Sequence, residues 1–408
     1  MNAAKIWQVA AKEILSTLRD RRALVSSLLI PLLILPATML GLPLALGGLF
    51  EREQTTVTEV AVEGLAFLPA DLRAAFEEEN VTLIETTTPE QDVREGIVQL
   101  ALSVPENLTE NLETREKVSL TLYSKRGNLR SELNAGKLTA AVAEFRRTLV
   151  AERLSEVGLG PEVLEPIVTE TVDASTEAER ESGQFGWLVP FFIAVWTLVG
   201  GQMTAIDATA GEKERGTLEA LLVAPVGRAE VVVGKFLATL SFGLSAALMA
   251  ITGYLLSGAL LKRLFLPQLG SEAEEIAALL GGSFSVSFST VILLVISALM
   301  LAALIAALLL SIAMFARSFK EAQTYVAPLS FLLIIPVMGL QFADFFSNNP
   351  LIYLVPILNA MLLMNDVVKG DVALLPLLLT WGSLLALSAL CLDFAYRSFK
   401  REGVIFRT

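Results

Sequence analysis

The stretch Phe288–Phe315 reads FSTVILLVISALMLAALIAALLLSIAMF and contains no charged side chain. An α-helix rises 1.5 Å per residue, so a helix of this length can cross the ~30 Å hydrocarbon core of a bilayer. Five more apolar stretches lie at Leu24–Leu49, Trp187–Ile206, Val231–Leu261, Tyr325–Phe345 and Val372–Phe394. The sequence therefore predicts a polytopic α-helical membrane protein with six transmembrane helices.

The composition of the 408 residues excludes several kinds of chemistry. Histidine is absent, which removes histidine-based catalytic triads, metal sites and proton relays. The single cysteine, Cys391, cannot form a disulfide framework or a thiolate cluster within one chain. No phosphate-binding G-x-x-x-x-G-K-[ST] motif occurs in the sequence. The Gly234-Lys235 pair does not complete one, because Phe236 stands where the motif requires Ser or Thr. We expect no catalytic residue, no metal site and no cofactor in this chain, and no nucleic-acid partner.

The distribution of Lys and Arg predicts the orientation in the membrane. Fifteen cations lie in the amino-terminal flank, in the loops after the second and fourth stretches, at Lys235 close behind the first of these loops and in the carboxy-terminal tail. The short loops on the other side contain three: Lys262, Arg263 and Lys369. This asymmetry predicts a multi-pass protein of the cell membrane with both termini in the cytoplasm.

Residues 51–185, between the first span (24–50) and the second, form a large insert of soluble composition. The segment contains 13 Lys and Arg against 27 Asp and Glu, so it accounts for the net charge of −12. Strand-like and helix-like stretches alternate along it. The expected strands are 57–62, 81–86, 97–104 and 117–124, and the expected helices are 69–79, 89–95 and one from 128 to 158. These patterns predict an extracytoplasmic α/β domain.

Two predicted cytoplasmic segments are candidates for mechanical roles. Residues 1–23 form a basic amphipathic helix with Trp7, Ile14 and Leu18 on one face, suited to the headgroup region or to a topology anchor. Residues 211–222 are predicted as a short helix that presents Leu218, Leu221 and Leu222. Such a helix between two spans is either a docking element for another protein or an ordinary interfacial loop.

Two further sets of residues have uncertain roles. The segment 346–371 is apolar but interrupted, which predicts two short re-entrant or interfacial helices in the outer half. The polar residues Gln202, Thr204 and Gln341 are candidates for a transport pathway, or for hydrogen bonds between helices. Carboxylates well inside the spans are nearly absent.

Three stretches resemble the permease subunits of type-two ABC exporters, and among them the sodium-export permease (NatB) group. They are KEILSTLRDRRALVSSLLIPLLILP (Lys12–Pro36), GEKERGTLEALLVAPVGRAEVVVGK (Gly211–Lys235) and VPILNAMLLMNDVVKGD (Val355–Asp371). The middle motif is the most specific. The resemblance extends over the whole architecture, from the amphipathic helix to the sixth span.

The resemblance implies one half of a permease dimer, homodimeric or heterodimeric, with two ATPase subunits that bind ATP and Mg. It assigns residues to three elements. The ATPase-coupling helix would use Glu212, Lys213, Glu214, Arg215, Gly216, Thr217, Leu218, Glu219, Leu222 and Pro225. The elbow helix would use Lys12, Glu13, Arg19, Asp20 and Arg21, and the outer re-entrant segment Pro356, Asn359, Asn365 and Gly370.

The resemblance predicts ATP-driven efflux by alternating access. It does not predict the cargo, because the sequence shows no set of residues suited to bind sodium. A membrane receptor or sensor with an extracytoplasmic ligand-binding domain is one alternative, although the cytoplasmic segments are short for an output domain. An ion-coupled secondary carrier is another, although such carriers usually have mid-membrane carboxylates. A membrane-embedded enzyme lacks candidate catalytic groups.

Overall fold

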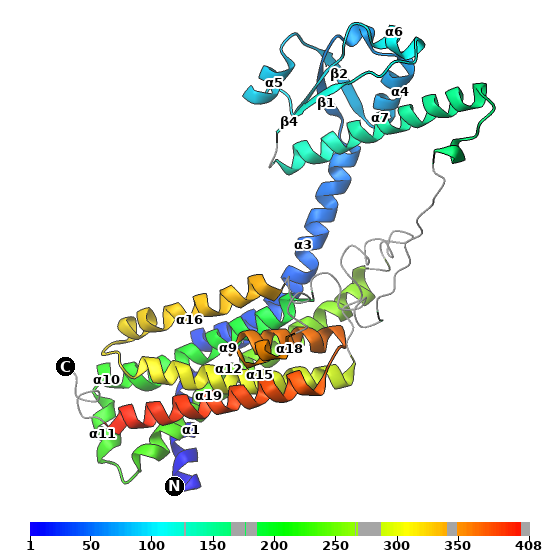
Figure 1. Cartoon of the computed structure of the whole chain (residues 1–408). Coiled ribbons are helices and arrows are strands. Elements are labelled where there is room, and N and C mark those ends of the chain that lie inside the picture. The colour runs from blue at the N-terminus through cyan, green and yellow to red at the C-terminus, as the bar shows by residue number, and fades with distance from the viewer. Residues whose placement is uncertain are drawn as a thin grey trace. The chain divides into compact units, whose positions relative to one another are not determined.

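The computed structural model describes residues 1–125, 128–164, 176, 186–265, 267, 287–340 and 349–400. The chain forms two compact units. Unit 1 comprises Met1–Pro43 and Ala174–Thr408, and unit 2 comprises Leu44–Asp173. Unit 1 is a bundle of helices and unit 2 an α/β fold (Figure 1).

The amino-terminal part of unit 1 begins with a helix that is separate from the first long apolar one. Asn2 caps α1 (Ala3–Arg19) by accepting a hydrogen bond from the Ala4 amide. Asp20 then caps a new helix, which continues without a break through three segments. These are α2 (Arg21–Leu24), the π-helical turn η1 (Val25–Leu29) and α3 (Ile30–Thr55).

The remaining helices of unit 1 follow unit 2 in the sequence. The first long run consists of α9 (Leu188–Ile206), the π-helical turn η4 (Asp207–Gly211) and α10 (Glu212–Glu214). The others are α11 (Thr217–Val223), α12 (Arg228–Leu260), η5 (Leu261–Phe265), α15 (Phe288–Ala313), α16 (Phe319–Leu340), η7 (Pro350–Leu354), α18 (Leu358–Lys369) and α19 (Leu374–Lys400).

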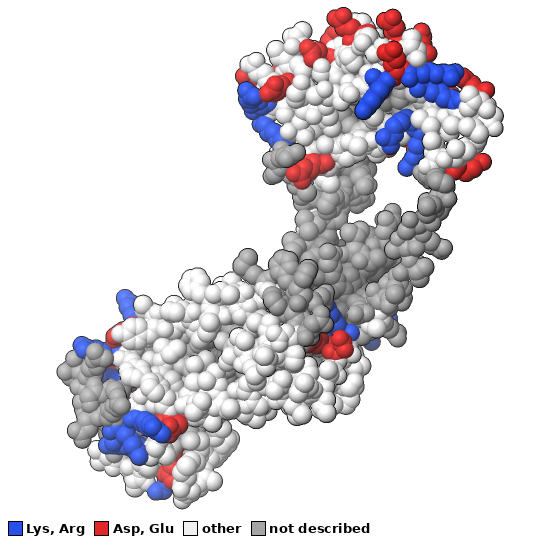
Figure 2. All heavy atoms as spheres, viewed as in Figure 1, with Lys and Arg blue, Asp and Glu red and all other residues white. Residues whose placement is uncertain are grey.

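Among the described residues, five helices are long and apolar enough to cross a membrane. They are Arg21–Gly41, Leu188–Glu214, Arg228–Leu264, Phe288–Ala313 and Leu374–Lys400. The surface agrees with this, because charged side chains gather at the two ends of the bundle (Figure 2). The chain is therefore a multi-pass membrane protein. The predicted span Tyr325–Phe345 coincides partly with α16, which contains Pro328 and Pro336, and its end lies outside the described residues. The sixth span stays a prediction.

The helices of unit 1 pack through small residues. The α9–α12 contact is the most extensive, and Gly200 of α9 lies against Ala246 and the Phe242 carbonyl of α12. Small residues let two helix backbones approach closely, which is the usual source of attraction between helices in lipid. α15 packs against α9, α12 and α19, so it lies at the centre of the bundle.

Unit 2 contains a four-stranded sheet in the order β2-β1-β3-β4. The strands are β1 (Thr58–Glu63), β2 (Val81–Glu85), β3 (Leu100–Ser103) and β4 (Thr121–Ser124), and only β4 is antiparallel to its neighbour. The helices are α4 (Ala70–Glu78), α5 (Pro89–Glu95), α6 (Leu108–Glu113) and α7 (Leu129–Glu156), with short 3-10 turns η2 (Leu65–Phe67) and η3 (Pro161–Val163).

Alternating side chains of the central strand β1 cover both faces of the sheet. Val60 and Val62 pack with α4 and α7 in the larger core, which includes Phe76 and Leu138. Ala61 points to the other face, where it packs with Val93 of α5. Each observed strand overlaps a predicted stretch, but β3 and β4 are about half as long as predicted. The helix α6 was not predicted.

Candidate functional site

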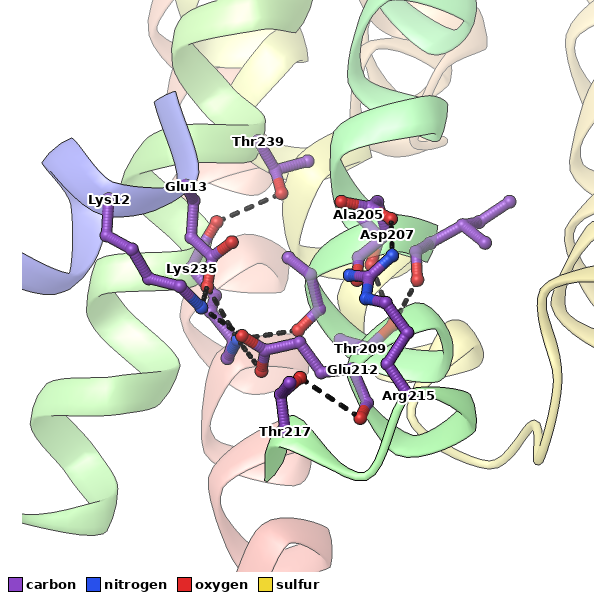
Figure 3. Close-up of polar contacts among 12 residues, drawn as sticks. Lys12, Glu13, Ala205, Asp207, Thr209, Glu212, Arg215, Thr217, Lys235 and Thr239 are labelled. Atoms are coloured by element: carbon purple, nitrogen blue, oxygen red, sulfur yellow. Dashed lines mark hydrogen bonds and ion pairs between the residues drawn. The ribbon is translucent and has the colours of Figure 1, made fainter. Parts of the chain in front are cut away.

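Four charged side chains meet at one end of the bundle, where α1, α10 and α12 come together (Figure 3). The Lys235 ammonium of α12, 3% exposed, donates hydrogen bonds to Glu13 Oε1 at 2.8 Å and to Glu212 Oε2 at 2.6 Å. Its third partner is the Ala208 carbonyl at 2.6 Å. All three N–H groups of this ammonium are therefore satisfied inside the protein.

Lys12 closes this cluster from its outer side. Its ammonium donates to Glu13 Oε1 at 3.2 Å and to Glu212 Oε1. Partial desolvation lowers the pKa of Lys12, but the Glu212 and Glu13 carboxylates outweigh this effect and hold it above its ordinary value. Lys12, Glu13, Glu212 and Lys235, which we call the ion cluster, are thus two cations and two anions with no net charge.

The amino-acid sequence of α1 explains why a carboxylate enters the core. Val9, Ala10, Glu13 and Thr17 recur at helical spacing and form the buried face of α1, while Trp7 is exposed. Contact with α12 is close because Gly234 has no side chain: a Cβ atom there would lie 2.7 Å from the Val9 Cβ. The buried face of α1 therefore includes the charged residue Glu13.

The segment predicted as one helix over 211–222 is divided in the structure, which corrects that prediction. Glu212 and Lys213 belong to α10, which continues α9 through the π-helical turn η4. Gly216 then adopts a left-handed conformation (φ 68°) that ends the helix, and α11 starts at Thr217. Thr217 donates a hydrogen bond back to the Glu212 carbonyl at 3.3 Å, which holds the turn closed.

The charges around this break bind within unit 1. Lys213 donates to the Met314 and Ala316 carbonyls at the end of α15. The Glu214 carboxylate accepts from the Phe319 amide at 2.8 Å, and Arg215 pairs with Asp207 at 2.7 Å. These contacts attach the α9–α10 end to the turn between α15 and α16.

The short helix α11 is anchored by its apolar side, which corrects the predicted docking face. Leu218 is buried with Val231, Val232, Met314, Ala395 and Phe399. Leu221 is half-buried against the same cluster. Val223, by contrast, is 87% exposed at the last turn. Glu219 and Leu222 lie in α11, but their side chains are outside the described residues.

The loop after α11 is attached to the start of α1. The Pro225 carbonyl accepts a hydrogen bond from Lys5 Nζ at 2.5 Å. The Glu230 carboxylate accepts from the Asn2 amide at 2.6 Å and from the Gly227 amide at 2.9 Å. The loop after α11 is therefore held by Lys5 of α1 and Glu230 of α12.

The remaining predicted elbow residues lie outside the ion cluster. Arg19 is in the last turn of α1 and is exposed. Asp20 accepts a hydrogen bond from the Arg22 amide at 2.9 Å and so starts α2, in which Arg21 is exposed.

The predicted outer segment contains η7 and α18. Pro356 lies between them, and Gly370 ends α18 in a left-handed conformation. Asn359 is fully buried and donates to the Tyr353 carbonyl at 3.0 Å and to Ser383 Oγ at 2.7 Å. Asn365 is also buried. The two asparagines therefore lie inside the bundle.

The three polar residues predicted for a transport pathway differ in their surroundings. Thr204 of α9 is buried and accepts from the Thr17 hydroxyl of α1 at 3.5 Å, close to the ion cluster. Gln202 is half-buried, and Gln341 lies outside the described residues. Within the described ranges, no three Asp, Glu or Cys side chains lie together in a way that could hold a metal ion.

Comparison with known proteins gives the family. The model of the ABC-2 family transporter proteins matches residues 7–404. The chain belongs to this family. It is also 27% identical to the ABC transporter permease protein NatB of Bacillus subtilis (strain 168), over 96% of this chain and 97% of that protein. The chain is thus the transmembrane subunit of an ABC transporter, a non-catalytic component whose family implies an ATPase partner.

Lys235 was not predicted as part of a site. It was counted among the cytoplasmic cations, and the Gly234-Lys235 pair was rejected as a phosphate-binding motif. A cation two turns inside an apolar helix was the available signal, because such a residue requires an internal partner. Which carboxylates serve as partners depends on helix packing.

Proposed function

We propose that this chain forms half of the permease pair of an ATP-driven exporter of the cell membrane, with both termini in the cytoplasm. Two ATPase subunits carrying ATP and Mg bind below the pair, and α11 rests on one of them. The proposal rests on one observation about α11. Val223 in its last turn is exposed and forms the tip, while Leu218 on the other side is buried among neighbouring helices.

The contacts of α11 suit it to transmit a displacement. Leu218 is buried in one cluster with residues of α12 and α19 and with Met314 at the end of α15, so a push on the exposed tip reaches three long helices at once. The ion cluster connects the same end of α12 to α1 and α10. A buried neutral cluster with satisfied hydrogen bonds resists separation, because each unpaired charge would be costly. We infer that closure of the ATPase pair moves these helix ends as one body and opens the pair to the other side.

The proposal is tested by purifying the tagged chain from its native membranes in mild detergent and assaying the bound ATPase. Val223→Glu places a charge on the exposed tip without touching the anchor. We expect it to reduce the recovered ATPase at least tenfold while the chain remains inserted. Leu351→Glu is the control, because Leu351 is also an exposed apolar side chain, 66% exposed against 87% for Val223, and lies in η7.

Other outcomes would contradict the proposal. A chain recovered without any ATPase, under conditions that preserve a known ABC complex, would favour a receptor or an ion-coupled carrier. Equal loss of ATPase in both variants would mean that α11 is not the docking element.

A further inference from the structure

A groove runs along one face of the bundle between α16 and α19. Its floor is one face of α15 with Leu308, Ser311 and Ile312, continued by Phe315 in the turn after the helix. Its walls are Leu390, Cys391 and Phe394 of α19 on one side and Tyr325 of α16 on the other. Its volume is about 430 Å³, within the ~300–1,000 Å³ range of small-molecule sites.

The surface of the groove is almost entirely apolar. The Ser311 hydroxyl donates to the Ala307 carbonyl at 2.7 Å and to the Cys391 carbonyl at 2.9 Å. The Tyr325 hydroxyl donates to Glu321 Oε1 at 2.5 Å. The two hydroxyl groups at the groove are therefore already bound to protein, and an occupant gains mainly from contact with carbon.

The groove lies on helices of the membrane-spanning bundle. Its floor and one wall belong to α15 and α19, two of the helices long and apolar enough to span the bilayer. Leu390, Phe394 and Tyr325 are exposed along its rim. Exposed apolar side chains on membrane-spanning helices suit contact with acyl chains.

Two cations lie at the end of the groove. Arg317 follows Phe315 by two residues, which limits the Cα separation to ~7 Å, and Lys320 lies in the first turn of α16. Both are exposed, and neither has a carboxylate partner among the described residues. Glu321 lies nearby, but its oxygens accept from Tyr325 Oη and from the Arg317 amide. The three side chains together carry a net charge of +1.

We propose that this groove binds one acyl chain of an anionic phospholipid, with the phosphate on Arg317 and Lys320. The hydrocarbon lies on the α15 face between Tyr325 and Phe394. The headgroup lies in the leaflet on the side of the α15–α16 turn, where basic residues attract anionic lipids by about 1 kcal/mol each. The proposal does not depend on the ATPase partner.

The test uses the full chain in phosphatidylcholine vesicles containing a small fraction of a phospholipid with a photoreactive acyl chain. The probe is phosphatidylglycerol in one sample and phosphatidylcholine in the other, and adducts are mapped by mass spectrometry. We expect adducts on 308–315 and 390–394 to be at least fivefold more abundant with the phosphatidylglycerol probe. Adducts on the exposed α19 residues Leu374, Leu375, Leu378 and Leu385 should be equal for both probes.

Two variants separate the parts of the proposed site. Arg317→Gln combined with Lys320→Gln should remove the preference for phosphatidylglycerol and leave labelling by phosphatidylcholine unchanged. Ile312→Trp should fill the floor and reduce groove adducts of both probes at least fivefold. Leu378→Trp is its control, because Leu378 is an exposed residue of α19 that does not line the groove.

Three outcomes would overturn the proposal. Equal groove labelling by both probes would describe ordinary surrounding lipid. A preference that survives loss of both cations would exclude the phosphate site. Absence of lipid adducts, together with cross-linking of the groove to a second copy of the chain, would make this face a protein interface. Arg317 and Lys320 are exposed, so the variant that replaces both should fold. It therefore tests the phosphate site even if Ile312→Trp does not fold.

Discussion

Lys235 lies inside α12 and is surrounded by oxygen atoms from two other parts of the chain. Glu13 pairs with it from α1, and Glu212 pairs with it from the end of the α9–α10 run. Glu13 lies more than 200 positions from Lys235 in the sequence, yet both belong to one ion cluster. A buried ion pair contributes little net stability compared with apolar packing, but loss of one member leaves a charge without a partner. The cluster therefore specifies how three helices meet.

At this scale the first prediction concerns Lys235→Met. The substitution leaves the Glu13 and Glu212 carboxylates near each other with only Lys12 to balance them. We expect a loss of about 3–5 kcal/mol in the free energy of unfolding. Thermal unfolding of the purified chain in detergent measures the direction and size of this loss.

Lys262→Met is the control for that experiment, because Lys262 is exposed in η5. It should change the midpoint of unfolding little. Adding Glu212→Gln to Lys235→Met should restore part of the stability. If Lys235→Met is as stable as the control, the ion cluster does not hold the helices together.

Gly234 gives the second prediction. A Cβ atom at this position would lie 2.7 Å from the Val9 Cβ and 3.0 Å from the Ile6 carbonyl oxygen, so Gly234→Ala forces α1 away from α12. Overpacking of this kind costs about 1–3 kcal/mol. Gly382→Ala is the matched control in α19, where nothing lies within 4 Å of the new atom. A midpoint for Gly234→Ala equal to that of Gly382→Ala would contradict the close contact.

At the scale of elements, α11 is stabilised by its surroundings. A helix of seven residues does not persist in water without tertiary contacts. Its start is set by the left-handed Gly216, and its position by the burial of Leu218. The hydrophobic pattern of the segment predicted that a helix forms, but it did not show that the apolar side faces inward. Contacts from α15 and α19 determine that orientation.

The third prediction concerns the turn before α11. Gly216→Ala keeps ample space around the new atom but places a side chain at φ 68°, which costs about 1–2 kcal/mol. We expect faster amide hydrogen exchange over residues 217–224 in the purified chain. Gly216→Asn should exchange more slowly than Gly216→Ala, since asparagine tolerates the left-handed region better. The same exchange rate in the wild type and in Gly216→Ala would show that the turn does not position α11.

The whole chain has a predicted topology that places the termini and the α11 segment on one side of the membrane and unit 2 on the other. The excess of cations near the termini and in the α11 segment predicts that these face the cytoplasm. Unit 2 is inserted between the first two spans and is expected on the opposite side. Both statements concern topology, and they can be tested together because the chain has a single native cysteine.

The fourth prediction uses Cys391→Ala as background, with one new cysteine at a time. Val223→Cys should react with a membrane-impermeant maleimide in inside-out vesicles but not in intact cells. Glu78→Cys, in the last turn of α4, should show the reverse pattern. Labelling of both positions from the same side would contradict the predicted topology.

Features that depend on local composition could be predicted without the structure. Apolar length predicted the spans, as in Phe288–Phe315, because a helix must bury its backbone polar groups within itself in lipid. Alternation of apolar and polar side chains predicted the strand around Leu122, because a sheet with a covered face imposes that period. The helix stop at Gly158 followed in the same way, since helix ends depend on nearby residues.

Tertiary structure alone decided which distant groups meet. The pairing of Lys235 with Glu13 and Glu212, the inward side of α11 and the groove on α15 each require the relative placement of several helices. Periodicity gives the faces of one helix but not the neighbour that covers each face. The free energy of contact between helices determines that choice, and those contacts join residues far apart in the chain.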